Sequence, residues 1–184
     1  ITGRQKMVAE VPVSRPAYMH SFGMTENYLV LTEFPLVVNP LRLKFSGNPF
    51  IRNYRWSPER GLRFHLIEKD SGQVIRRATA KASFSFHHVN SYEADDEVVI
   101  DLIAYPDCDV IDQLYLDRLR SNQPVTATGE LTRFRWHADG QITTTSLSQT
   151  PIELPQIDAR RVAQAYRHVF GASVSESGDF LDSL

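Results

Sequence analysis

Residues 82–105 read ASFSFHHVNSYEADDEVVIDLIAY, and this stretch decides the fold class. Its two arms, Ala82–Tyr92 and Glu97–Tyr105, are rich in aromatic and β-branched side chains, which favour extended strands. Ala94-Asp95-Asp96 lies between the arms and contains the Asp residues that are common in tight turns. The stretch therefore predicts an antiparallel β-hairpin.

Two further hairpins are predicted, one on each side of this stretch. Each pairs two β-rich runs around a turn that contains Gly, a residue that readily adopts turn conformations. The runs are Leu62–Lys69 and Gln73–Thr79 around Asp70-Ser71-Gly72, and Glu130–His137 and Gln141–Leu147 around Ala138-Asp139-Gly140. Asn27–Glu33 (NYLVLTE) adds another strand. Successive hairpins form a meander, so we expect an all-β fold of the sandwich, barrel or propeller type.

Helical patterning is confined to two short segments. Asp112–Asn122 (DQLYLDRLRSN) brings Leu114, Leu116 and Leu119 near one another, which predicts a short helix inserted on a long loop. Asp158–His168 could also begin helically, with Asp158 as the N-cap.

Composition excludes several classes of protein. The 184 residues carry a net charge of −2, with Lys and Arg scattered along the chain, so no basic face points to nucleic acid. No stretch approaches the length of about 20 apolar residues that a membrane-spanning helix needs. The single Cys108 excludes an internal disulfide and favours a reducing, cytoplasmic location. Because Ile1–Met7 looks like neither a natural start nor a signal peptide, we expect the chain to be part of a longer protein.

The six histidines show no zinc-finger spacing and no HExxH helix. His65, His137 and His168 lie in strand-like or ordinary contexts, so structural roles are expected for them. His20 and His87 are different because each lies among aromatic residues with few charges nearby. An imidazole in such surroundings stays neutral and can present a lone pair to a metal. On residue context alone, however, a core histidine bonded to a carbonyl group is the favoured interpretation.

Longer motifs around these residues resemble those of the carotenoid cleavage oxygenases. Residues 18–28 (YMHSFGMTENY) resemble the family's HSFG(L/M)T-x-x-Y signature, and residues 86–93 (FHHVNSYE) resemble its FHH(I/V)NxYE. Residues 152–157 (IELPQI) resemble its (F/I)E(F/L)PQI. The three motifs occur in the family's order, and Ser21 favours the branch of β-carotene oxygenases and the retinoid isomerohydrolase. The chain is therefore identified as a member of this family.

The resemblance implies a fold and a metal site. The family folds as a seven-bladed β-propeller, so residues 1–184 would form two to three blades of a partial propeller domain. The resemblance makes His20 and His87 two of the four histidines that bind Fe(2+), with the other two outside this chain. It makes Glu153 the carboxylate that holds His87, with the matching glutamate for His20 also lying outside the chain.

Other positions carry weaker implications. Phe86 and Leu154 match positions that line the family's substrate tunnel, although an ordinary core role explains them equally well. His88 and Glu93 belong to the second motif but not to the iron site, and His88 should point away from His87 if the segment is a strand. Pro40–Phe50 (PLRLKFSGNPF) matches a segment that contacts membranes in relatives, or is a partly buried loop.

Three functions are consistent with these motifs. The first is cleavage of a carotenoid or apocarotenoid double bond by O2 into two carbonyl products, with peripheral membrane contact by a cytoplasmic enzyme. The second is a retinoid isomerohydrolase-like reaction that uses the same iron ligands. The third is a non-catalytic fragment that binds apolar ligands.

Overall fold

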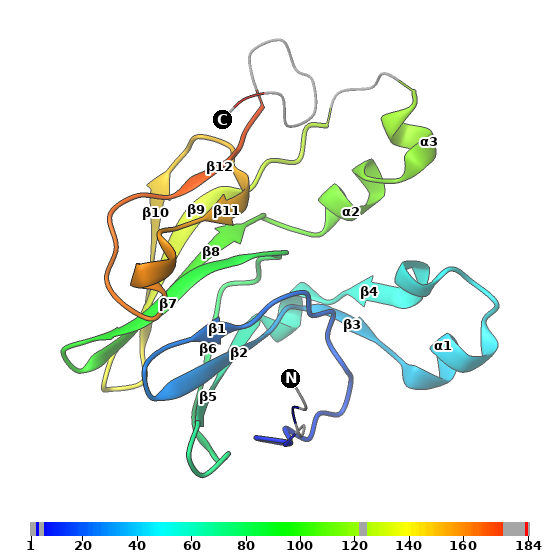
Figure 1. Cartoon of the computed structure of the whole chain (residues 1–184). Helices are drawn as coiled ribbons and strands as arrows, with labels where there is room; N and C mark the ends of the chain where they lie inside the picture. The colour runs from blue at the N-terminus through cyan, green and yellow to red at the C-terminus, as the bar shows by residue number, and fades with distance from the viewer. Residues whose placement is uncertain (1–2, 4–5, 122–124, 175–182, 184) are drawn as a thin grey trace.

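The computed structural model describes residue 3, residues 6–121 and 125–174, and residue 183. These residues form two four-stranded antiparallel sheets, each with its own neighbouring two-stranded sheet (Figure 1). The all-β prediction is confirmed, and the two larger sheets are two blades of a propeller-type fold.

The first sheet has the order β1-β2-β5-β6. Its strands are β1 (Gly23–Met24), β2 (Tyr28–Glu33), β5 (Leu62–Glu68) and β6 (Val74–Ala80). The chain leaves this sheet after β2 and returns at β5. The excursion contains β3 (Leu36–Val38), α1 (Pro40–Phe45), η1 (Phe50–Asn53), β4 (Tyr54–Trp56) and η2 (Pro58–Arg60), with β3 and β4 paired.

The second sheet is a simple meander with the order β10-β9-β8-β7. Its strands are β7 (His88–Ala94), β8 (Glu97–Ala104), β9 (Glu130–Trp136) and β10 (Ile142–Ser148). All three predicted hairpins are present, and Asp95, Gly72 and Gly140 occupy positive φ angles in their turns. The strand predicted from Ala82 is regular only from His88 onward. Residues 82–87 pair with the other arm through the isolated bridge between Phe84 and Tyr105 and through a hydrogen bond from the Ile103 amide to the His87 carbonyl at 3.1 Å.

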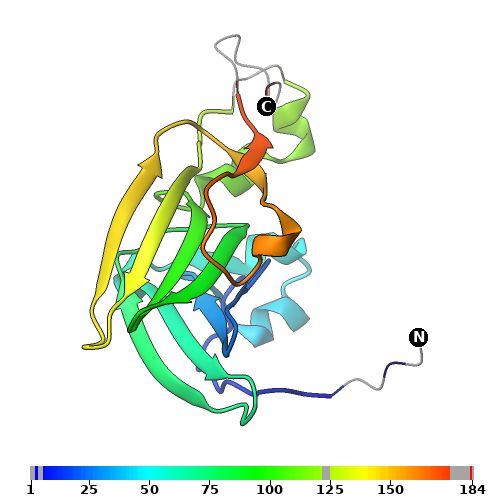
Figure 2. The ribbon, with the colours of Figure 1, turned by 60° about the vertical axis from the view of Figure 1, so that its left-hand side comes forward.

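One hydrophobic core lies between the two sheets (Figure 2). Phe64 of β5 packs against Phe134 and Trp136 of β9, with ring centroids 5.4 Å and 6.5 Å apart. All three side chains are buried. Burial of a large apolar side chain contributes about 1.5–3 kcal/mol, so this contact fixes the two sheets against each other.

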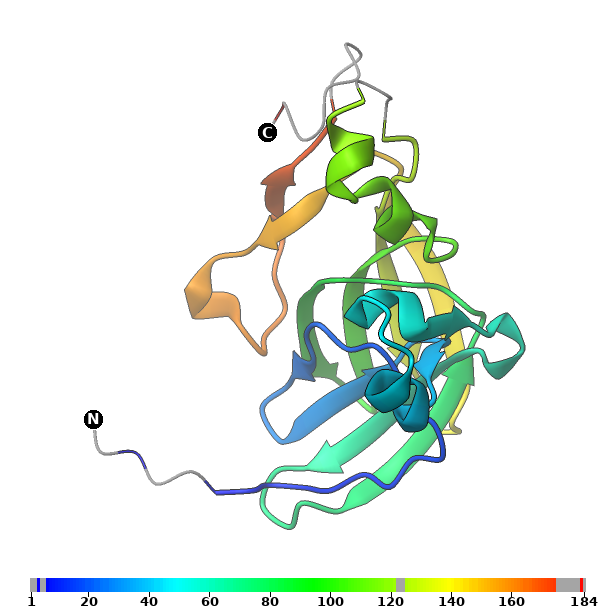
Figure 3. The same ribbon diagram turned by 90° about the vertical axis from the view of Figure 1, so that its right-hand side faces the viewer.

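Helices α1 (cyan), α2 (Asp109–Gln113) and α3 (Leu116–Leu119; both green) lie on the same side of the molecule, which faces the viewer in Figure 3. The predicted helix over Asp112–Asn122 is instead the two shorter helices α2 and α3. The extended backbone of Tyr115 interrupts them, with ψ at 141°, and Asn122 lies outside the described residues. Within the described part of the chain, no helix is long and apolar enough to cross a membrane.

The last described segment returns across the second sheet. It contains β11 (Glu153–Gln156), η3 (Ala159–Arg161) and β12 (Phe170–Ala172), and β11 pairs with β12. Asp158 caps η3 as expected, although the helical turn is only three residues long. The buried amide of Asn90 in β7 donates to the carbonyl groups of Arg161 and Gln164, so the segment is anchored to the sheet close to β11.

Candidate metal centre

His20 and His87 come from different sheets. His20 lies three residues before β1, and His87 directly precedes β7. These strands lie at the facing edges of the two sheets and contact each other. The fold therefore brings together two histidines that are far apart in the sequence.

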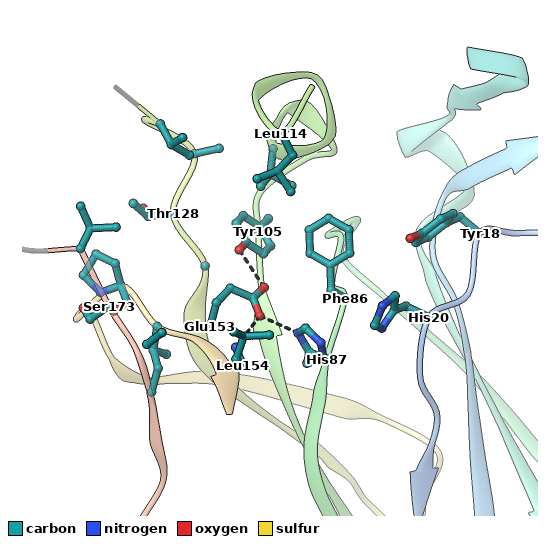
Figure 4. Close-up of a pocket in the computed structure, with 18 residues that line it drawn as sticks. Tyr18, His20, Phe86, His87, Tyr105, Leu114, Thr128, Glu153, Leu154 and Ser173 are labelled. Carbon is teal, nitrogen blue, oxygen red and sulfur yellow. Dashed lines mark hydrogen bonds and ion pairs between the residues drawn. The ribbon is translucent and has the colours of Figure 1, made fainter. Parts of the chain in front are cut away.

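The two imidazole rings meet edge to face. Their centroids are 4.9 Å apart, with 79° between the ring planes (Figure 4). Phe86 packs against both rings, at 5.9 Å from His20 and 6.3 Å from His87. The fold thus places the two rings directly beside each other.

Glu153 at the start of β11 binds His87 directly. Its Oε2 atom lies 2.6 Å from Nδ1 of His87, and it also accepts a hydrogen bond from the Leu154 amide at 2.9 Å. The Glu153 side chain is only 12% exposed. Within the described part of the chain it pairs with His87 and Tyr105 and with no arginine. A carboxylate at Nδ1 holds the proton on that nitrogen, which leaves a lone pair on Nε2. Nε2 of His87 makes no hydrogen bond within the described residues, and neither does the His20 ring.

Tyr105 completes this arrangement and was not predicted from the sequence. Its hydroxyl donates to Oε1 of Glu153 at 2.7 Å. Burial, and then the neighbouring Glu153 carboxylate, raises the pKa of Tyr105 far above its usual value, so the hydroxyl remains a donor. The predicted hairpin of Ala82–Tyr92 with Glu97–Tyr105 was the signal that could have placed it here, since the structure pairs Tyr105 with Phe84, two residues before Phe86.

These side chains form one wall of a cavity of about 430 Å³. The other walls are mostly apolar and include Tyr18 and Leu114. Phe86 and Leu154 both line the cavity, at the positions expected from the motifs. Leu154 is half exposed and has a φ of 52°, which is unusual for a bulky side chain. Such backbone strain is common at functional sites.

His88 points away from the cavity, as expected. Its Nδ1 lies 2.9 Å from the Ser21 hydroxyl, and its Nε2 lies 2.8 Å from the Thr32 hydroxyl. Burial, and then the nearby His87, lowers the pKa of His88 to about 3, so the ring is neutral at physiological pH.

Glu93, at the end of the second motif, binds residues near the end of the first motif. Its carboxylate accepts hydrogen bonds from the Thr25 hydroxyl at 2.6 Å and from the Asn27 amide N–H and side chain at 2.9 Å each. Residues of the second motif thus bind residues of the first at two separate places.

Two other histidines that were expected to be structural are paired with carboxylates. His65 pairs with buried Glu33 at 3.2 Å, and His137 pairs with Glu97 at 2.6 Å.

The donor atoms suit a transition metal. Imidazoles with unused ring nitrogens are ligands that Fe(II) accepts readily. Among the described residues no group of three or more His, Cys, Asp or Glu side chains could hold a metal ion.

A sequence profile of the family described as "Retinal pigment epithelial membrane protein" matches residues 2–184. This chain belongs to the carotenoid cleavage oxygenase family. Among the relatives of this carotenoid oxygenase chain are the carotenoid isomerooxygenase of Galleria mellonella and the beta,beta-carotene 15,15'-dioxygenase of Homo sapiens. The first is 36% identical over 59% of this chain and 22% of its own length. The second is 30% identical over 88% of this chain and 36% of its own length.

Solved structures share the fold. The cobalt-substituted Synechocystis ACO superposes with a TM-score of 0.75 at 23% identity, over 88% of this chain and 33% of that protein. The chain thus spans about a fifth to a third of the length of the relatives it matches.

Proposed function

We propose that this chain is the central segment of a longer iron-dependent enzyme that cleaves a carotenoid or apocarotenoid double bond with O2 into two carbonyl products. The observation that carries the proposal is the cluster of His20, His87 and Glu153 on the wall of an apolar cavity. Family membership and the names of relatives such as the human dioxygenase support the same reaction class.

Each residue of the cluster receives a defined role. His20 and His87 would hold Fe(2+) through ring nitrogens that make no other bond in the described structure. Bound there, ferrous iron supplies a redox-active centre that lets O2 react with a polyene. Glu153 keeps the His87 proton on Nδ1 and fixes the ring plane, because a carboxylate partner orients a ligating imidazole. Tyr105 in turn fixes the Glu153 carboxylate.

The cavity supports an apolar substrate. Phe86 touches both imidazole rings, so a molecule that packs on Phe86 lies next to the proposed iron site. Leu154 lies next to Glu153 and lines the same cavity (Figure 4). Apolar walls with few polar groups are typical of pockets for hydrophobic ligands. We therefore assign Phe86 and Leu154 to the substrate tunnel.

The test is product analysis with the full-length protein, several carotenoids and ¹⁸O2. The proposal predicts two carbonyl products with label from O2 and consumption of one O2 per cleavage. A product formed without O2 consumption would instead favour the isomerohydrolase-like reaction, which the same ligands can support. Apolar-ligand binding with no iron in the full-length protein would identify a non-catalytic binding protein.

A membrane contact is proposed for α1 and η1. Leu41, Phe45 and Phe50 are 65%, 72% and 60% exposed, and Arg42 and Lys44 lie on the same short helix. Apolar side chains beside basic ones favour the surface of an anionic bilayer. Flotation of the full-length protein with phosphatidylserine vesicles should weaken in Phe45→Asp, and unchanged flotation would contradict the contact. A cytoplasmic location stays a prediction.

A further inference from the structure

The hydroxyl of Ser21 joins the two histidine-bearing segments. Ser21 directly follows His20, and its Oγ donates to the carbonyl oxygen of Phe86 at 2.9 Å. The same atom accepts the backbone N–H of His88 at 2.9 Å. Ser21 therefore binds the backbone on both sides of His87.

The hydrogen-bond arrangement around Ser21 has a single consistent solution. A serine hydroxyl has one proton to donate and two lone pairs to accept with. The proton must go to the Phe86 carbonyl, which can only accept. Nδ1 of His88, 2.9 Å from Oγ, must then be protonated and donate to Ser21. Nε2 of His88 consequently accepts from the Thr32 hydroxyl at 2.8 Å.

This solution leaves the Ser21 hydroxyl saturated. Thr32 sits in β2 and is fully buried, so it fixes the His88 ring, and the ring fixes Ser21. Ser21 cannot rotate without breaking its bond to Phe86 or His88. The positions of His20 and His87 are thus coupled through one side-chain oxygen.

We propose that Ser21 is a positioning residue that sets the separation of His20 and His87 and so preorganises them for a metal ion. This inference rests on the proposed metal role of the two histidines. It assigns the Ser21-His88 pair to placement of the ligand segments, whereas Glu153 orients only the His87 ring.

The full-length protein, stripped of metal and titrated with Co(2+), provides the test. Ser21→Ala should bind Co(2+) on the order of 10–100-fold more weakly, the usual effect of losing a group that orients a ligand. Its cobalt d–d absorption bands should also shift, because the ligand geometry changes. Ser21→Thr keeps the hydroxyl and should restore both the affinity and the spectrum.

Ser83→Ala is the matched control. The Ser83 hydroxyl is buried and has no hydrogen-bond partner within the described residues, so its removal should leave Co(2+) affinity and spectrum as in the wild type. A Ser21→Ala protein that matches wild type in both readouts would overturn the inference. So would a lower melting temperature with an unchanged cobalt spectrum, since that result identifies a purely structural hydroxyl.

If Ser21→Ala does not fold, Thr32→Val tests the same role of Ser21. Valine fills the same space but removes the donor to Nε2 of His88, which allows the ring to change tautomer and compete for the Ser21 proton. A weaker Co(2+) affinity with a shifted spectrum is expected, and unchanged values would contradict the inference. Absence of Co(2+) and Fe(2+) binding in the wild type would instead refute the proposed function itself.

Discussion

The Glu153 carboxylate lies 2.6 Å from Nδ1 of His87, although 66 residues separate them in the sequence. No local geometry forces this contact, because β11 reaches the site only after the chain has completed the second sheet. The bond thus depends on the assembled fold, and it determines which nitrogen of His87 faces the cavity.

Glu153→Gln in the full-length protein should reduce both iron content and turnover, but less than His87→Ala does. The amide keeps the shape and remains a weaker acceptor for His87 Nδ1–H. Glu153→Ala removes the acceptor, and a loss on the order of 10–100-fold is expected. Iron per protein measured by mass spectrometry, with initial cleavage rates, checks this ordering. Unchanged iron and rate in Glu153→Ala would refute the assigned role.

His20→Ala and His87→Ala should each abolish iron retention and cleavage. Either change removes one of the two ring nitrogens of the proposed metal site. His137→Ala is the control because His137 bonds Glu97 and Thr143 at a hairpin and does not line the cavity. Iron analysis after gel filtration distinguishes the variants, and full iron content in either ligand variant would contradict the proposed metal site.

Glu93 should contribute stability that depends on pH. Burial raises its pKa, but hydrogen bonds from Thr25 and Asn27 outweigh burial, and the net pKa lies below the usual value. A carboxyl with a lowered folded pKa stabilises the fold above its unfolded pKa, and this stability is lost as the pH falls through the folded pKa. The free energies of unfolding of wild type and Glu93→Gln, measured in urea, should therefore differ at pH 7. This difference should shrink at pH values below about 4. A difference that does not change with pH would contradict this account.

Asp101→Asn should destabilise the second sheet strongly. Asp101 is fully buried and receives two hydrogen bonds from Arg133, at 2.9 Å and 2.8 Å, and one from Tyr166 at 2.6 Å. The substitution removes the negative charge and leaves Arg133 without its charged partner. This should lower the free energy of unfolding by about 3 kcal/mol. Asp158→Asn breaks the exposed pair with Arg160 and serves as the control with little expected effect. Equal unfolding midpoints for the two variants would contradict the prediction.

The sequence was most informative where local chemistry decides the structure. Turn residues such as Asp95, Gly72 and Gly140 mark hairpins because they tolerate positive φ angles, and the structure has those hairpins. The helical insertion was less predictable. Its leucine spacing permits one helix, but the chain breaks at Tyr115, whose ring stacks against the Arg52 guanidinium at 5.2 Å from the centroid. That contact is tertiary and leaves no pattern in the local sequence.

In the candidate site, too, some residues could be predicted from the sequence and others could not. His20, His87 and Glu153 were predictable only through their motifs, since residue context alone left a core role open for both histidines. Tyr105 was missed because it lies outside all three motifs and comes close to Glu153 only in the folded chain, where it pairs with Phe84 just after β8. The role of Glu93 was likewise hidden, because the motif names the residue but not its partners Thr25 and Asn27.

The position of the two histidines at the facing edges of the sheets also affects how the protein unfolds. All of the first sheet lies between His20 and His87 along the chain. A metal held by both rings would act as a reversible cross-link that closes this span, much as a disulfide would. Because the metal binds the folded form, the melting temperature should rise with free metal concentration. Amide hydrogens of β1 and β7 should then exchange more slowly with solvent than those of the outer strands β6 and β10, so metal loading would make this inner edge the most protected part of the fold.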